Sequence, residues 1–170
     1  MKIAIASDHG GIELKSVLIN HLQERNIEVI DCGTYTKESC DYPDYAEKAC
    51  RKIQQGDADL AVLVCGTGLG MSIAANKMKG IRAAVCGEDF SAHYARAHNN
   101  ANVLCLGARV TGPGLAVLIL DTFLDSSFEG GRHERRVNKI MALEAEAAAK
   151  TAESAENKTE TDAVETENQI

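Results

Sequence analysis

No stretch of this 170-residue sequence is apolar for long enough to span a bilayer, which takes about 20 residues in a helix. The N-terminus has no long apolar core of the kind found in secretory signal peptides, and residues 1–6 predict a first strand instead. Basic residues are nowhere concentrated enough to predict a nucleic-acid surface. We therefore expect a cytoplasmic protein without membrane or nucleic-acid partners.

Tryptophan is absent, and the six cysteines include no C-x-x-C pair. An even cysteine count predicts a disulfide framework only in short secreted chains. Reduced thiols in a cytoplasmic enzyme are therefore the better interpretation, and no metal site is predicted. The cysteines stand at positions 32, 40, 50, 65, 86 and 105.

Apolar residues make up 45% of the chain and charged residues 25%, as in soluble globular proteins of one domain. The formal net charge is -7, and residues 144–170 carry eight acidic residues against two lysines. We expect a domain over residues 1–143 and an acidic, low-complexity tail over 144–170. The tail begins with helix-favouring alanines, and from residue 151 it has too few large apolar side chains to order itself, which predicts mobility.

Short apolar runs alternate with amphipathic segments along the first 143 residues. The apolar runs are nearly continuous, which is typical of parallel strands covered on both faces. We therefore predict an α/β fold, a three-layer α/β/α Rossmann-like domain with a five-stranded parallel sheet. The expected strands are 2–6, 27–31, 60–65, 82–86 and 102–106, and the expected helices are 12–25, 45–55, 70–78, 91–98 and 112–124, with a further helix after residue 131.

Ligands of such sheets bind beyond the carboxyl ends of the strands, so the residues that follow each strand are candidates for a site. Asp8 and His9 follow the first strand and precede two glycines. Asp8 is equally well interpreted as a helix cap and as a ligand contact. His98 and Asn99 precede the fifth strand; His98 could act as an acid or base near neutral pH, although a loop histidine is more often merely solvated.

The segment from Cys65 to Gly70 follows the third strand and reads CGTGLG. Its three glycines leave backbone N–H groups free to face an anion or a developing oxyanion. A dinucleotide loop is the alternative, because Glu88 lies at a suitable distance to bind a ribose. The third glycine, however, comes one residue earlier than in G-x-G-x-x-G.

Cys65 itself has two interpretations. A cysteine in a buried strand is usually a small hydrophobic residue. At a strand end directly before a helix, a cysteine is also placed for chemistry, because that position favours the thiolate. Arg109, Arg132 and Arg136 could form paired bonds with a phosphate, although each is as readily interpreted as a solvated surface residue.

Seven stretches in this order resemble the ribose-5-phosphate isomerase type B family, which includes galactose-6-phosphate and allose-6-phosphate isomerases. The resemblance runs from Met1 to about Leu143. Its most specific stretch is CGTGLGMSIAANK at 65–77, and the others are SDHGG at 7–11, DYP at 41–43, GIRA at 80–83, HN at 98–99, LGAR at 106–109 and GGRH at 130–133.

The resemblance implies a cofactor-free aldose–ketose isomerase that interconverts ribose 5-phosphate and ribulose 5-phosphate through a cis-enediolate, in the non-oxidative pentose phosphate route. It implies a homodimer or dimer of dimers with shared active sites. Cys65 would be the base, His98 the ring-opening residue assisted by Asp8, and Thr67 would lie near the migrating proton. The implied substrate contacts are Asp8, His9, Tyr42, Gly66, Thr67, Gly68, Leu69, Gly70, Asn99, Arg109, Arg132 and Arg136.

One alternative is disfavoured by the sequence, and two stay open. One branch of the family replaces the cysteine and has a glutamate at the position of Met71, so this sequence implies the thiol version of the mechanism. The substrate could be a six-carbon sugar, allose 6-phosphate or galactose 6-phosphate. The domain could also be a catalytically inactive sugar-phosphate-binding protein.

Overall fold

The computed structural model describes residues 1–167, with side chains described as far as Thr151. Its five strands form one parallel sheet in the order β2-β1-β3-β5-β4. This confirms the predicted fold class. The strands are β1 (Lys2–Ser7), β2 (Glu28–Asp31), β3 (Leu60–Cys65), β4 (Ala83–Val85) and β5 (Val103–Gly107), and the helices between and after them are α1 (Ile12–Glu24), α2 (Tyr42–Gln54), α3 (Leu69–Ala75), α4 (Asp89–Ala97) and α5 (Pro113–Asp125).

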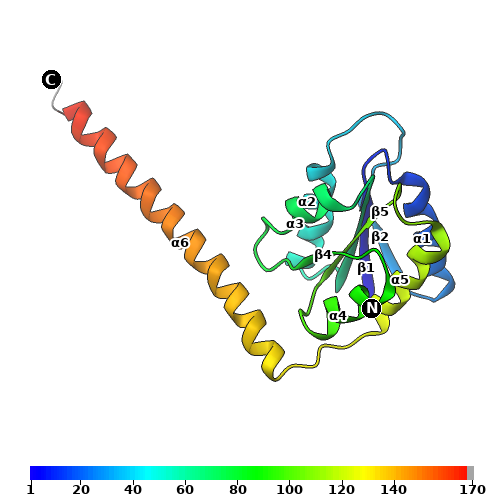
Figure 1. The fold of residues 1–170 in the computed structure, drawn as a ribbon. Helices are drawn as coiled ribbons and strands as arrows, with labels where there is room; N and C mark the ends of the chain where they lie inside the picture. The colour runs from blue at the N-terminus through cyan, green and yellow to red at the C-terminus, as the bar shows by residue number, and fades with distance from the viewer. Residues whose placement is uncertain (168–170) are drawn as a thin grey trace. The chain divides into compact units, whose positions relative to one another are not determined.

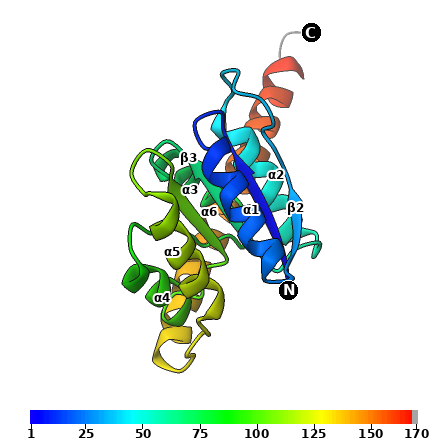
Figure 2. The ribbon, with the colours of Figure 1, turned by 90° about the vertical axis from the view of Figure 1, so that its right-hand side faces the viewer.

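The direction of each crossover decides which face of the sheet its helix covers. The connections β1-α1-β2 and β4-α4-β5 move one way across the sheet, and β2-α2-β3 and β3-α3-β4 move the other way. Because such crossovers are right-handed, the two groups of helices must lie on opposite faces. Figures 1 and 2 show α1 and α5 on one face and α2 and α3 on the other.

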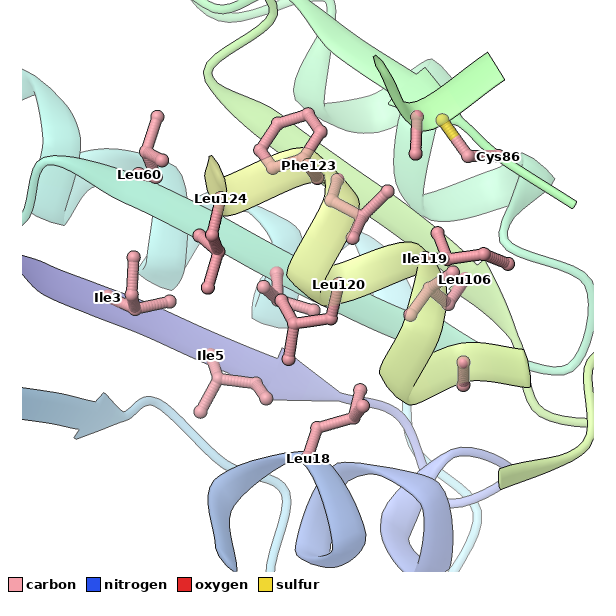
Figure 3. Close-up of a cluster of buried hydrophobic side chains, with 14 of the residues drawn as sticks. Ile3, Ile5, Leu18, Leu60, Cys86, Leu106, Ile119, Leu120, Phe123 and Leu124 are labelled. Carbon is pink, nitrogen blue, oxygen red and sulfur yellow. The ribbon is translucent and has the colours of Figure 1, made fainter. Parts of the chain in front are cut away.

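Two hydrophobic cores result, one on each face of the sheet. On the first face, Leu18 of α1 and Leu120 and Phe123 of α5 are fully buried against Ile3 and Ile5 of β1 (Figure 3). The core on the second face has smaller side chains, among them Ala46, Ala49 and Cys50 of α2. Successive strand residues alternate between the two cores, which explains why the strands read as continuously apolar.

Helix α6 (Arg132–Glu167) continues well past the predicted helical start of the tail. The chain divides into two compact units, residues 1–134 and 135–170, and this division falls inside α6. The domain boundary after residue 143 stays a prediction. The backbone is helical over the described part of the segment predicted to be mobile, and mobility there stays a prediction. Its last three residues, 168–170, lie outside the described residues. None of the helices within 1–167 combines the length and apolar character needed to cross a membrane.

Candidate active site

The site lies where β1 and β3 run side by side at the centre of the sheet. The chain leaves β1 towards α1 on one face and leaves β3 towards α3 on the other. Neighbouring strands that diverge in this way open a crevice at their carboxyl ends. Asp8 and His9 follow β1, and Cys65 ends β3, so two of the predicted stretches meet in this crevice.

The turn after Cys65 is folded around its sulfur. The N–H of Gly68 donates to the Cys65 sulfur at 3.1 Å, and Cys65 is 5% exposed. Gly68 has φ +78°, a left-handed conformation that glycine adopts without strain, and a Cβ there would lie 3.1 Å from the backbone of Leu106. An amide that faces sulfur stabilises negative charge on it. The thiol therefore has a built partner for the thiolate form.

Thr67 lies at the apex of this turn, beside the end of β5. Its hydroxyl accepts a 3.4 Å bond from the N–H of Leu69. Gly107 allows the close approach, since a Cβ at that position would lie 2.7 Å from the Thr67 carbonyl carbon. The turn is thus held against β5 by backbone contacts that require glycine at Gly107.

Asp8 and Arg109 both lie beside Gly10 at the mouth of the crevice. Asp8 is 8% exposed, and its Oδ1 accepts a 2.9 Å bond from the N–H of Gly10. A Cβ built on Gly10 would lie 3.3 Å from that Oδ1 and 3.7 Å from a guanidinium nitrogen of Arg109. The Arg109 side chain also lies over Gly66. A carboxylate, a guanidinium and a row of backbone amides are therefore gathered beside Cys65.

Two further predicted residues line the same crevice. Tyr42, the first residue of α2, packs its ring against Gly70. His9 accepts a 3.2 Å bond at Nδ1 from the N–H of Cys40, which ties β1 to the loop that precedes α2. The carboxyl edge of the sheet thus unites Asp8, His9, Tyr42, the 65–70 turn and Arg109.

Buried Lys15 supports this loop, and sequence reasoning did not single it out. Its ammonium pairs with Asp31 at 2.6 Å and donates to the carbonyl of Thr34 at 3.0 Å. Lys15 is 2% exposed. A lysine on the apolar stripe of α1 was the available signal, because a buried lysine requires a partner.

The structure does not bring His98 to Cys65 within one chain. His98 follows α4 and lies before the start of β5, whereas Cys65 pairs with Gly107 at the end of β5. The five residues of β5 put about 15 Å of strand between the two edges. The neighbouring Asn99 is exposed at the same starting edge.

Arg132 shares this second edge, because its side chain donates to His133 at 3.2 Å and His133 stacks on His98 with ring centroids 3.9 Å apart. Arg136 belongs to the unit 135–170 and is described only as an exposed residue of α6. The predicted set therefore divides into a thiol half and a histidine half.

Three thiols are excluded from the site by burial. Burial raises the pKa of Cys50 to about 12 and that of Cys86 to about 11, and it also raises the pKa of Cys105. These cysteines pack in the cores as small hydrophobic residues.

The interpretation of Glu88 as a ribose-binding acid also fails, because its carboxylate caps α4 by accepting from the N–H of Ser91.

Comparison with known proteins gives the family. The ribose/galactose isomerase family matches residues 3–140. The chain belongs to that family. Ribose-5-phosphate isomerase B of Escherichia coli (strain K12) is 50% identical over 143 residues, which cover 84% of this chain and 96% of the relative.

Solved structures agree with this assignment. Ribose-5-phosphate isomerase B of Clostridium thermocellum has a TM-score of 0.86 and 51% identity, covering 86% of this chain and 99% of that one. The Thermotoga maritima ribose 5-phosphate isomerase has a TM-score of 0.82 and 57% identity, over 83% and 97% of the two chains. The Mycoplasma genitalium enzyme, solved with bound ribulose 5-phosphate, has a TM-score of 0.82 and 45% identity, over 85% and 97%.

Proposed function

We propose that this protein is an aldose–ketose isomerase that interconverts D-ribose 5-phosphate and D-ribulose 5-phosphate. The observation that carries the proposal is the Gly68 N–H 3.1 Å from the Cys65 sulfur, in the crevice between β1 and β3. The relatives named for this activity match over nearly their whole length, which supports the same substrate.

The chemistry is an intramolecular proton transfer through a cis-enediolate. The Cys65 thiolate removes the proton from C2 of the open-chain aldose, and the electron pair moves to form the C1–C2 double bond, leaving negative charge on the C1 oxygen. The thiol then returns the proton to C1, and the proton of the C2 hydroxyl passes to the C1 oxygen. The C2 carbonyl and the C1 hydroxyl of the ketose therefore form without net gain or loss of protons. Amides of the 65–70 turn stabilise the enediolate oxygens, and Thr67 lies beside the migrating proton.

Each complete site requires two copies of the chain. Cys65 and His98 lie at opposite edges of the sheet, so one protomer cannot present both to a single pentose. We place the thiol half of one protomer opposite the histidine half of another, in a homodimer or a dimer of dimers. His98 then opens the furanose ring, with Asp8 of the other protomer accepting the C1 hydroxyl proton.

The phosphate group of the substrate is held by arginine side chains. Arg109 lies over Gly66 in the thiol half, and Arg132 lies in the histidine half. With Arg136, these guanidinium groups form the phosphate clamp, while His9, Tyr42 and Asn99 contact the sugar hydroxyls. Paired N–H donors of arginine match the oxygens of a phosphate in geometry as well as charge.

The deciding experiment is an isomerase assay with ribose 5-phosphate and allose 6-phosphate side by side. We expect turnover of the pentose to exceed that of the hexose, and Cys65→Ala to abolish both. Cys32→Ala, which removes a thiol after β2, is the matched control and retains activity. Near-wild-type turnover by Cys65→Ala would exclude Cys65 as the base, and a preference for allose 6-phosphate would replace the substrate.

A further inference from the structure

Glu129 lies between two histidines at the histidine half of the site. Its Oε2 is 3.6 Å from Nε2 of His98 and 3.5 Å from Nε2 of His133. The backbone N–H of Glu129 donates to the carbonyl of Ala97 at 3.0 Å, so this loop is anchored to the end of α4 directly beside His98. Neither Glu129 nor His133 was among the functional residues predicted from the sequence.

The rings around His98 restrict its orientation. His133 stacks on the His98 ring with an interplanar angle of 12°, and Tyr94 also contacts it, with ring centroids 4.3 Å apart. His133 is 5% exposed, so the surrounding residues hold its ring in place beside His98. Among the described residues, the phenol of Tyr94, the imidazole of His133 and the carboxylate of Glu129 lie against His98.

The hydrogen bond from Arg132 to His133 determines which of the two histidines can donate a proton towards the Glu129 carboxylate. The Nε–H of Arg132 donates to Nε2 of His133 at 3.2 Å, so this nitrogen of His133 is engaged as an acceptor. Nε2 of His98 is the remaining nitrogen beside Glu129. A carboxylate at 3.6 Å from that nitrogen orients the imidazole.

The same three side chains are also within reach of a common metal ion. The stacking argues against that role, because a metal lies in the plane of each imidazole that binds it. Two nearly parallel rings with centroids 3.9 Å apart do not share a plane. The arrangement instead suits proton transfer by one ring held in place by the other.

We propose that Glu129 is a positioning residue for ring opening: its carboxylate orients His98 and stabilises the charge His98 carries when protonated. In this step, which rests on the proposed function, the C1–O4 bond of the furanose breaks and His98 gives its proton to O4. The C1 hydroxyl gives its proton to Asp8 of the other protomer, and the C1 aldehyde forms. His133 fixes the plane of the His98 ring by stacking on it.

Direction of turnover separates ring opening from isomerisation. Ribose 5-phosphate is mainly a furanose, whereas ribulose 5-phosphate has its C5 oxygen blocked and stays open-chain. Ring opening is therefore needed from the aldose side alone, since an open-chain aldose released from the ketose side closes by itself in water. Loss of a residue that serves only ring opening should therefore lower kcat with ribose 5-phosphate and leave kcat with ribulose 5-phosphate nearly unchanged.

The test measures both directions for Glu129→Gln, which removes the charge at constant size. We expect kcat with ribose 5-phosphate to fall about tenfold and kcat with ribulose 5-phosphate to stay within about twofold. Glu129→Asp keeps the charge and recovers part of the loss. Glu134→Gln, which removes an exposed acid from the first turn of α6, is the matched control and leaves both rates unchanged.

Equal losses in both directions would assign Glu129 a structural role, and no loss in either would leave it without one; both outcomes overturn the inference. A wild-type protein inactive in both directions would overturn the proposed function itself, and the assignment of Glu129 with it. A wild-type protein active in both directions, with Glu129→Gln impaired from the aldose side alone, supports the two together.

Discussion

The ring of Tyr42 lies so close to Gly70 that a Cβ on Gly70 would come within 2.8 Å of its Cε2 and Cζ atoms. This contact joins the start of α2 to the start of α3 across the mouth of the crevice. Gly70 therefore has a steric function, because its missing side chain lets an aromatic ring cover the turn that carries Cys65.

Gly70→Ala is expected to displace Tyr42 and lower kcat/KM about tenfold, because loss of substrate positioning reduces the rate. The control is the same change in a Tyr42→Ala background, where the added methyl group meets no ring. Steady-state kinetics of the two single variants and the double variant measure the coupling. Additive losses would show that the contact is unimportant for catalysis.

Complementation tests the division of the site between two copies. Cys65→Ala and His98→Asn proteins are each expected to be inactive alone. After unfolding and refolding as an equal mixture, half of the dimers contain one chain of each kind, and one of their two sites is intact. Activity should therefore return to about a quarter of the wild-type value if dimers form at random. A mixture that stays inactive would mean that each chain supplies its own Cys65 and His98.

Removal of a clamp arginine should weaken an anchor used equally in the ground state and the transition state. We expect Arg109→Met to raise KM about tenfold or more with little change in kcat. Arg135→Met is the control, because Arg135 is an exposed residue of α6 outside the proposed clamp. A fall in kcat at constant KM would count against the clamp.

Lys15→Met tests the support beneath the loop between β2 and α2. The substitution leaves Asp31 without its 2.6 Å partner and the buried Thr34 carbonyl without its donor. We expect the free energy of unfolding to fall by about 2 kcal/mol, measured by denaturant titration. Lys37→Met is the control, because the Lys37–Glu13 pair is exposed on both sides and contributes little. Equal stabilities of the two variants would contradict the structural role of Lys15.

Thiol alkylation at pH 8 should distinguish the cysteines. Burial raises the pKa of Cys86 to about 11, so only about one molecule in a thousand has a thiolate there, and Cys50, with a pKa of about 12, has fewer. Mass spectrometry after iodoacetamide treatment is expected to find Cys65 modified as activity is lost, with ribose 5-phosphate protecting it. Cys50, Cys86 and Cys105 should react only after unfolding. Loss of activity with Cys65 unmodified would require another reactive group.

The alternation of strands and helices could be predicted from the sequence, because each apolar run and each amphipathic stripe is a local pattern. The predicted boundaries of the elements were less accurate. Helix α2 begins at Tyr42, three residues before the predicted start. Pro43 fits the first turn of this helix, because the N–H groups there have no partner within the helix. The stretch from 65 to 70 was also readable, because a turn rich in glycine has a local cause.

Which of these local features meet depends on the packing of the whole domain. Strand order depends on how side chains from distant elements pack, so the sequence could not place β5 between β3 and β4. That order, with crossovers that return the chain to the starting edge, separates His98 from Cys65 and puts His98 beside Glu129 and His133. Contacts over such distances in the chain leave no periodic trace in the sequence, because each depends on the simultaneous position of two or three elements.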